Sequence, residues 1–436
     1  AFYTSPFEES AILTIDGVGE WSTTSYGHAS NDSVKITNDI RWPHSLGLFY
    51  SAFTYFLGFK VNEGEYKLMG LSSYGKPKYY DLIMENLIDV KNDGSIHLNM
   101  EYFAFTYDKV MTSKKFSKLF GIEPKTKDEK TLQIHFDIGA SAQKVLEDVI
   151  LKMVDHIYNK TKMKNLCIGG GVALNGVANY KILKESLFDN VHIPPSPGDA
   201  GSAVGAAQYL YYVYHKNLKD TSDNAQLIQE NVYVGPSYSN ENIKLFLDSK
   251  NILYESFDDV TLLQKTAQLI ADGNVVGWYQ GKMEWGPRAL GNRSILADPR
   301  RTDMKDILNA KIKHRESFRP FAPSIMEEYA SDYFEIDVPS PYMLMVAPVK
   351  KPKEIPAVTH VDGTGRLQTV SKESNELYYN LINEFYNITG VPVIINTSMN
   401  VMGEPIVNTP EQAYQMIIKT DMDCIVLGNN IIRRIN

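Results

Sequence analysis

The order of apolar and polar side chains predicts alternating strands and helices along the chain. Residues 10–15 and 22–28 carry β-forming side chains on either side of a glycine-rich turn, which predicts two paired strands. Over residues 44–58 and 137–159, apolar side chains recur at helical spacing, so both stretches are predicted as helices. Residues 63–80 are dense in glycine, proline and polar groups, and we expect a loop there.

A strand, a glycine-containing loop and a helix then follow each other twice. NLCIGGG leads into the helical ALNGVANYKILKESL, and VHIPP leads into SPGDAGSAVGAAQYLYYVYH. This order is typical of an α/β domain whose helices pack on a sheet. Residues 89–130 carry many Lys, Asp and Gly residues, and we expect a surface excursion.

A polar stretch at residues 216–231 lacks a clear period and marks the expected domain boundary. A chain of 436 residues is too long for one ordinary core, so we expect two domains, 1–225 and 230–436. The second domain also mixes strands and helices. Its predicted helices cover 259–272, 374–389 and 410–420, and its predicted strands 275–280, 341–349, 391–398 and 424–428.

Composition narrows the class of protein. With 43% hydrophobic and 22% charged residues, no secretory leader and no apolar run of about 20 residues, the chain is expected to be soluble. The only cysteines, Cys167 and Cys424, lie far apart in apolar surroundings, which predicts buried thiols and a cytoplasmic location. The net charge of −8 offers no field for nucleic acid, so any bound anion needs a local cationic cluster.

Two loops of the first domain carry candidate ligand-binding residues. Gly169, Gly170 and Gly171 close a predicted strand before a helix, where backbone N–H groups can approach a phosphate. The spacing is neither GxGxxG nor a Walker motif, which argues against a kinase-type loop. Asp16 and Asp199 follow strands and could share a divalent metal, but a turn and a helix N-cap explain them equally well.

Cationic side chains gather in one part of the second domain. Within 32 residues lie Arg288, Arg293, Arg300, Arg301, Lys313, Arg315 and Arg319. Guanidinium groups bind phosphate oxygens bidentately, and the turn residues of GPRALGNRS favour a site there, whereas KHRE alone is more typical of a solvated surface. The cluster predicts a site for two polyanions at once.

Two later motifs add polar side chains that could bind a nucleotide or an acyl phosphate, although each is also a common turn-former. They supply His360, Asp362 and Arg366 from THVDGTGRLQTV, and Asn396, Thr397, Ser398 and Asn400 from NTSMNVMGEPIV.

Together these motifs resemble the signature blocks of the O-carbamoyltransferases, of the nodulation-protein-U and antibiotic-carbamoylating type. The blocks run in order from residue 1 to about 430: GVGEWSTTSYG, EYKLMGLSSYGKP, GGGVALNGVAN, PSPGDAGSAVGAA, MEWGPRALGNRSILADPR, KHRESFRPFAPS, PAVTHVDGTGRLQTV and NTSMNVMGEPIVNTPEQA.

The resemblance implies an α/β chain with an actin-like ATPase (ASKHA-type) domain, incomplete at its N-terminus, followed by a YrdC-like α/β domain. The YrdC-like domain would form carbamoyl-adenylate from ATP and carbamoyl phosphate, with release of pyrophosphate. The actin-like domain would pass the carbamoyl group to an acceptor hydroxyl. Saccharides are the commonest acceptors in the family, in polysaccharide or secondary-metabolite biosynthesis.

The resemblance also implies residue roles. Arg288, Lys313, Arg319 and Arg366 would act on the phosphates as catalytic residues; further nucleotide or carbamoyl phosphate contacts would come from Gly169, Gly170, Gly171, Asn175, Arg293, Arg315, Thr397, Ser398 and Asn400. Asp16 and Asp199 match the family's two metal-ligating aspartates. The implied cofactors are ATP with Mg²⁺ and a divalent transition metal, such as iron, in the actin-like domain.

One departure from the family concerns the metal. In the family, the histidine ligands of the metal form an HxxxH motif shortly before the AFY that opens this chain. We therefore expect that this chain is part of a longer protein or that its transfer site is incomplete. His28 and His44 could be imagined as replacements, but structural roles explain them better.

Two other functions fit the same domain types. A tRNA threonylcarbamoyl transferase is disfavoured by the acidic balance, and a non-catalytic nucleotide or sugar sensor by the arginine cluster. The sequence leaves the acceptor and the oligomeric state open.

Overall fold

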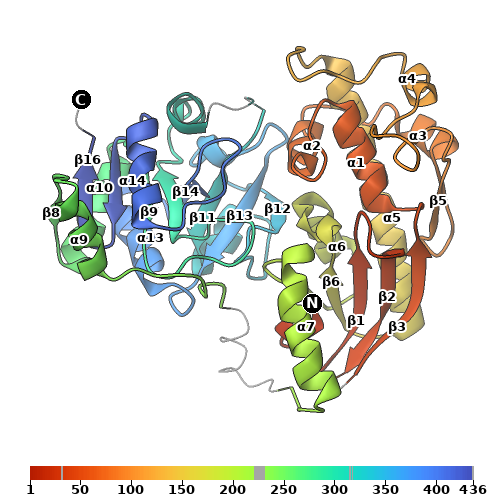
Figure 1. Cartoon of the computed structure of the whole chain (residues 1–436), viewed down its shortest axis with the longest axis horizontal. Helices are drawn as coiled ribbons and strands as arrows, with labels where there is room; N and C mark the ends of the chain where they lie inside the picture. The colour runs from red at the N-terminus through yellow and green to blue at the C-terminus, as the bar shows by residue number, and fades with distance from the viewer. Residues whose placement is uncertain (31–32, 220–230, 314–315, 317, 435–436) are drawn as a thin grey trace. The chain divides into compact units, whose positions relative to one another are not determined.

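The computed structural model describes residues 1–30, 33–219, 231–313, 316 and 318–434. Their contacts divide the chain into two compact units, Ala1–Glu230 (unit 1) and Asn231–Asn436 (unit 2) (Figure 1). Each unit contains both helices and strands, so the predicted mixed α/β class is confirmed. Among the described residues, no helix has the length and apolarity needed to cross a membrane.

Unit 1 is built on a five-stranded sheet in the order β3-β2-β1-β6-β7. The strands are β1 (Glu9–Ile15), β2 (Ser22–Ser30), β3 (Ser33–Arg41), β6 (Asn165–Gly169) and β7 (Asn190–His192). β1, β6 and β7 run parallel, whereas β2 and β3 extend the sheet as an antiparallel hairpin. The predicted pairing of the first two strands is confirmed, with Ile12 opposite Gly27.

Helices surround this sheet. They are α1 (Leu46–Phe56), α2 (Glu65–Ser72), α3 (Tyr80–Asn86), α4 (Lys114–Phe120), α5 (Gln133–Thr161), α6 (Gly176–Glu185) and α7 (Ser202–Gln208), with short helices η1 (Phe2–Thr4), η2 (Gly171–Leu174), η3 (Asp199–Gly201) and η4 (Tyr209–Tyr214). Both long predicted helices are confirmed as α1 and α5. Ser45 begins α1 by accepting a hydrogen bond from the backbone of Leu48 at 3.0 Å.

Two expectations for unit 1 are wrong. The region expected to be a loop, 63–80, contains α2, because Leu68, Met69 and Leu71 bury an apolar side against the protein. The region expected to be a surface excursion, 89–130, contains α4 and most of the hairpin of β4 (Ile88–Val90) and β5 (Ile96–Leu98). Phe116 of α4 is fully buried and lies 4.8 Å from Phe56 between ring centroids.

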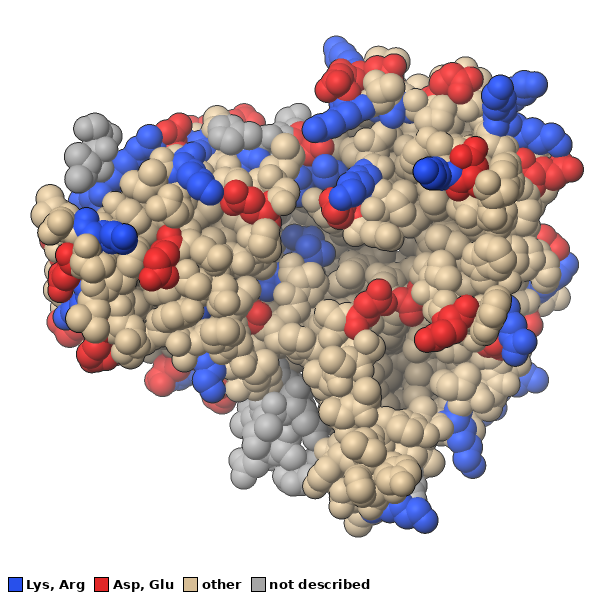
Figure 2. Space-filling view, in the orientation of Figure 1, with Lys and Arg blue, Asp and Glu red and all other residues tan. Residues whose placement is uncertain are grey.

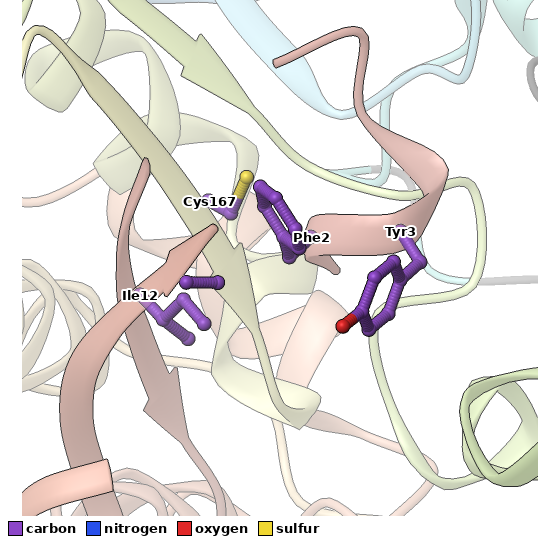
Figure 3. Close-up of a cluster of buried hydrophobic side chains, with 5 residues drawn as sticks. Phe2, Tyr3, Ile12 and Cys167 are labelled. Carbon is purple, nitrogen blue, oxygen red and sulfur yellow. The ribbon is translucent and has the colours of Figure 1, made fainter. Parts of the chain in front are cut away.

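The start of the chain packs into the sheet of unit 1. Phe2 and Tyr3 form a buried cluster with Ile12, Ala29 and Cys167 (Figure 3). Cys167 is a free, buried thiol, as predicted. The ring of Tyr3 also stacks on that of Tyr212 in η4, with 4.6 Å between the ring centroids. Most of the remaining α7–η4 surface is exposed and carries few charged side chains (Figure 2).

Unit 2 is built on a nine-stranded sheet in the order β12-β13-β11-β14-β10-β9-β15-β16-β8. The strands are β8 (Glu255–Ser256), β9 (Val276–Tyr279), β10 (Arg293–Ala297), β11 (Ala322–Met326), β12 (Met345–Pro348), β13 (Thr364–Val370), β14 (Val393–Ser398), β15 (Cys424–Leu427) and β16 (Asn430–Arg433). The central strands β9, β10, β11 and β15 are buried throughout, which explains their nearly continuous apolar sequences.

The helices described in unit 2 are α9 (Asn240–Ser249), α10 (Asp259–Ala271), α11 (Met304–Leu308), α12 (Ala330–Tyr333), α13 (Glu376–Thr389) and α14 (Pro410–Lys419), with η5 (Asn309–Lys313), η6 (Glu327–Tyr329) and η7 (Pro356–Val358). Four of them, α9, α10, α13 and α14, begin at a side chain that accepts a backbone hydrogen bond. Asp258, Asn375 and Thr409 cap α10, α13 and α14, the three helices predicted from the sequence.

Candidate functional site

Strand order in unit 2 brings the predicted polar motifs to one end of the sheet. β10 and β11 both run antiparallel to β14, with Ser294 opposite Ser398 and Ala322 opposite Asn396. β13 runs parallel to β11. The starts of β10, β11 and β13 therefore lie beside the end of β14. We call this place the cationic sheet end; the relevant side chains are Arg319 before β11, Arg366 in β13, and Thr397 and Ser398 at the end of β14.

Lys313 is the most closely held cation at this end. Its buried ammonium donates to the carbonyl oxygens of Ser398 at 2.6 Å and Asn400 at 2.8 Å, and to Oδ1 of Asn400 at 2.9 Å. Ser398 Oγ in turn donates to Asn400 Oδ1 at 2.7 Å. The structure thus brings Lys313 next to Ser398 and Asn400, which follow it by 85 and 87 residues in the sequence. The ammonium fixes the turn that follows β14.

The loop that carries Arg288 is fixed by a carboxylate that the sequence analysis missed. Oε1 of the buried Glu284 accepts backbone hydrogen bonds from Leu290 and Asn292, both at 2.8 Å, and from Arg293 at 3.1 Å. One side chain therefore holds three amides that would otherwise need other acceptors. The only signal in the sequence is a carboxylate placed just before the compact GPRALG turn.

Amide side chains of the sheet hold the same loop from the other side. Gln368 of β13 donates to the carbonyl of Leu290 at 2.9 Å, and Asn396 of β14 donates to that of Ala289 at 3.2 Å. The two amides are also joined to each other at 2.9 Å. Asn396, singled out in the sequence as a possible ligand contact, is therefore part of the support for the loop.

Arg293 has a different place from the one predicted. Its guanidinium is fully buried and donates to the backbone carbonyls of Gln280, Asn292, Pro236 and Gly281. It also lies 3.8 Å from the centre of the Tyr279 ring. These contacts favour a structural role over the predicted phosphate contact, because the terminal nitrogens already serve the protein backbone.

The basic cluster is smaller than its sequence suggested. Arg300 pairs with Asp298 at 2.6 Å and Arg301 pairs with Asp303 at 2.8 Å. Arg319 lies 3.5 Å from Glu316. Arg315 lies outside the described residues. Acidic side chains two or three residues away in the sequence therefore take up part of the positive charge. A count of the cations alone does not reveal this local pairing.

His360 forms a hydrogen-bond chain with Thr364 and Asp362. Its Nδ1 lies 3.0 Å from Thr364 Oγ1, which donates to Asp362 Oδ1 at 2.7 Å. Burial is the main cause that lowers the pKa of His360 to about 4; the charge of Asp362 opposes this shift, and the charges of Arg366 and Lys305 add to it. The imidazole is therefore neutral at neutral pH.

Unit 1 places the predicted aspartate and glycine loops at the ends of its parallel strands. Asp16 follows β1, and its Oδ1 accepts a hydrogen bond from the amide of Gly171 at 2.6 Å. Gly170 has φ 91° and donates to the carbonyl of Pro197 at 2.8 Å. Burial raises the pKa of Asp16, and the charge of Asp199 raises it further, while the Gly171 hydrogen bond opposes both. The two aspartates are thus close enough to interact.

Asn175 serves the fold in the described structure. Its Oδ1 caps α6 by accepting from Ala178 at 3.0 Å, and its amide nitrogen donates to Gln143 at 3.0 Å. Gln143 also accepts from Tyr50 at 2.7 Å. This buried network gives Asn175 a positioning role, so an adenylate contact by its side chain stays a prediction.

Asp16 and Asp199 offer two carboxylates to a divalent cation. Mg²⁺ is often bound through one or two carboxylates, with water and phosphate as further ligands. Among the described residues, no group of three or more His, Cys, Asp or Glu side chains is placed to hold a metal. His28 lies opposite Ala11 of β1, which is five residues before Asp16 in the sequence. The ring of His44 accepts a hydrogen bond from the amide of Leu98 at 3.1 Å. Neither histidine supplies the site.

Comparison with known proteins now bears on both sites. A model described as "Carbamoyltransferase N-terminus" matches residues 1–208, and one described as "Carbamoyltransferase C-terminus" matches residues 267–434. An uncharacterized protein, sll1178, from Synechocystis sp. is 47% identical, over all of this chain and 74% of that protein. The chain belongs to the carbamoyltransferase family.

Two nodulation proteins are also similar to this carbamoyltransferase over its whole length. NolNO from Sinorhizobium fredii is 38% identical and NolO from Bradyrhizobium diazoefficiens is 37% identical. The chain covers 62% of the first and 77% of the second, so both relatives are longer. A crystal structure of full-length HypF shares 19% identity over 40% of this chain and 26% of its own, with a TM-score of 0.28, and supports no inference.

The family assignment divides between the two sites. The aspartate and glycine loops of unit 1 lie within the N-terminal carbamoyltransferase model, and the cationic sheet end lies within the C-terminal one. The sequence resemblance to carbamoyltransferases is therefore confirmed.

Proposed function

We propose that this carbamoyltransferase uses ATP and carbamoyl phosphate to form carbamoyl-adenylate, and that unit 2 is the YrdC-like domain that does so. The observation that carries the proposal is the cationic sheet end, where Lys313 is clasped by Ser398 and Asn400 beside the starts of the strands that bring Arg319 and Arg366. Lys313 fixes this turn, and the guanidinium groups of Arg319 and Arg366 would stabilise phosphate charge as preorganised donors.

Each residue has a proposed task. Arg288, Arg319 and Arg366 neutralise the phosphates of ATP and carbamoyl phosphate, which otherwise repel each other. Lys313 holds the turn of Ser398 and Asn400 in place, and the hydroxyl of Thr397 would donate a hydrogen bond to a phosphate oxygen. Arg315 lies outside the described residues, and its predicted phosphate contact stays part of the proposal. Carbamoyl-adenylate keeps the carbamoyl group and AMP, so pyrophosphate and phosphate leave and one water is consumed.

Unit 1 is proposed as the actin-like (ASKHA-type) domain that transfers the carbamoyl group to a hydroxyl. The backbone of Gly169, Gly170 and Gly171 would face the adenylate. Asp16 and Asp199 would hold a divalent transition metal such as iron, which would supply Lewis-acid polarisation of the carbamoyl carbonyl or the hydroxyl. Mg²⁺ would accompany ATP.

The proposed acceptor is the hydroxyl of a saccharide or related small molecule, in cytoplasmic polysaccharide or secondary-metabolite biosynthesis. Two buried free thiols, Cys167 and Cys424, support a reducing compartment. The two nodulation proteins among the relatives are compatible with a biosynthetic enzyme.

The first test is pyrophosphate release by the full chain. We expect release that requires both ATP and carbamoyl phosphate, together with a mass gain of one carbamoyl group in a screen of glycosides and sugar nucleotides. If pyrophosphate release is independent of carbamoyl phosphate, or absent, the adenylate-forming function is contradicted. Release without carbamoylated product would confine the failure to the acceptor or to the transfer site.

A further inference from the structure

His360 carries a buried acceptor that the chemistry described so far does not use. Its Nε2 atom is shielded from solvent and has no hydrogen-bond partner among the described residues. Buried polar atoms are rarely left without a partner, and a neutral ring nitrogen in this situation indicates a missing ligand or water. The atom lies in the motif that also supplies Arg366, so it belongs to the cationic sheet end.

The hydrogen-bond chain fixes which nitrogen of His360 carries the proton. Asp362 can only accept, so the hydroxyl of Thr364 must donate its single hydrogen to Asp362 Oδ1. The same hydroxyl must then accept from His360, which places the proton of the neutral ring on Nδ1. Nε2 is left as a bare lone pair, able to accept a hydrogen bond and unable to donate one.

The charges around this lone pair point to the kind of ligand. Arg366 and Lys305 are near enough to act on the imidazole, and both offer only donors. A phosphate beside such cations is recognised by groups that donate hydrogen bonds. An acceptor among them serves a ligand that has a donor group only a few bonds from its phosphate.

Carbamoyl phosphate meets this requirement. Its phosphate and carbonyl oxygens accept hydrogen bonds, and its amide N–H groups, three bonds from the phosphorus, are its only strong donors. The amino group of adenine is much farther from the phosphates of ATP. Acetyl phosphate has the same shape and charge, but a methyl group in place of the amide nitrogen.

We propose that Nε2 of His360 accepts a hydrogen bond from the carbamoyl amide and thereby distinguishes carbamoyl phosphate from acyl phosphates that lack an N–H group. The inference rests on the proposed function of unit 2. Asp362 and Thr364 are positioning residues in this account, because they keep the lone pair on the ligand side of the ring.

Direct binding tests this inference separately from catalysis. Two stable phosphonates, phosphonoacetamide and 2-oxopropylphosphonate, differ only in an amino group replaced by a methyl group, and calorimetry with the full chain measures both. We expect the wild-type chain to bind the amide at least 10-fold more tightly, and His360→Leu to reduce this preference to about 2-fold or less. His97→Leu, at an exposed histidine of unit 1, should keep the wild-type preference.

Two further variants separate recognition from folding. His360→Gln keeps an acceptor oxygen and should retain part of the preference, and Thr364→Val, which frees the tautomer, should lie between wild type and His360→Leu. Equal binding of the two phosphonates by the wild-type chain overturns the proposal, as does an unchanged preference in a folded His360→Leu chain. Pyrophosphate release reports separately on the proposed function, since it can fail while the binding preference persists.

Discussion

The two units present opposite charges at the ends of their sheets. In unit 2 the strand ends carry Lys313, Arg319 and Arg366, whereas in unit 1 they carry Asp16 and Asp199. The first arrangement suits phosphate groups, and the second suits a cation or a hydroxyl that must lose a proton. Under the proposed function, this difference would separate two steps with opposite electrostatic needs into two units of one chain.

The loops at these ends are also held in different ways. In unit 2, the side chain of Glu284 collects three backbone amides of the arginine loop. In unit 1, the backbone itself packs tightly, because a β-carbon at Gly170 would clash with the carbonyl of Ile15. One loop depends on a carboxylate and the other on the absence of a side chain, so different substitutions should break them.

The largest effect is expected from loss of a cation in unit 2. Arg366→Ala should lower carbamoyl phosphate-dependent pyrophosphate release by about 100- to 1,000-fold, because a preorganised donor to the phosphates is lost. Arg301→Ala is the matched control, since Arg301 pairs with the exposed Asp303, and it should stay within about two-fold of wild type. Equal losses in both variants would remove the distinction between site arginines and surface arginines.

A second prediction concerns the glycine loop of unit 1. Gly170→Ala should destabilise the chain by about 3–5 kcal/mol, because it combines a φ of 91° with a clash against backbone. Gly121 has a φ of 70° and no heavy atom within 4 Å of an added β-carbon, so Gly121→Ala should cost only about 1 kcal/mol. Urea unfolding followed by circular dichroism measures both; similar costs would mean that close packing does not hold this loop.

The arginine loop should respond to loss of its carboxylate. Glu284→Ala leaves three buried amides without their acceptor, and we expect about 2–4 kcal/mol less stability. The exposed Glu373 provides the control, because Glu373→Ala should change stability by less than about 0.5 kcal/mol. A Glu284→Ala chain as stable as the control would show that the amides find other partners.

The smallest effect is expected in the alkylation rates of the two buried cysteines, one in each unit. Burial raises the pKa of the Cys424 thiol in unit 2 to about 12 and also raises that of Cys167 in unit 1. A raised pKa keeps both thiols protonated at pH 8, so alkylation should be slow until the unit opens. Mass spectrometry of alkylated peptides should show faster labelling of Cys167 in Gly170→Ala and of Cys424 in Glu284→Ala. Identical labelling of both thiols in each variant would mean that the units open together.

Periodic patterns predicted the fold better than they predicted the site. The helices around residues 44–58 and 137–159 follow from apolar spacing, and the mixed α/β class follows from the alternation of elements. Region 89–130 was misjudged because its polar composition hides three buried phenylalanines, Phe103, Phe116 and Phe120. Composition describes a segment on average, whereas burial depends on a few side chains.

The motifs predicted a site, and the structure brings together some, but not all, of the residues predicted for it. Lys313, Ser398 and Asn400 meet as the sequence suggested. Arg293, by contrast, is buried in the core, and the sequence did not predict that Glu284 holds the arginine loop. Which way a side chain points depends on strand register and on partners far away in sequence, and neither can be read from a local motif.

The separation of the two chemistries can be tested most directly with a chain that lacks both carboxylates of unit 1. Carbamoyl phosphate-dependent exchange of labelled pyrophosphate into ATP reports on adenylate formation alone. If unit 2 forms the adenylate, a folded Asp16→Asn, Asp199→Asn double variant should exchange within about two-fold of wild type, while carbamoyl transfer to an acceptor falls by at least 100-fold. Loss of exchange in this variant would contradict the account, because it would place the first reaction at the carboxylates of unit 1.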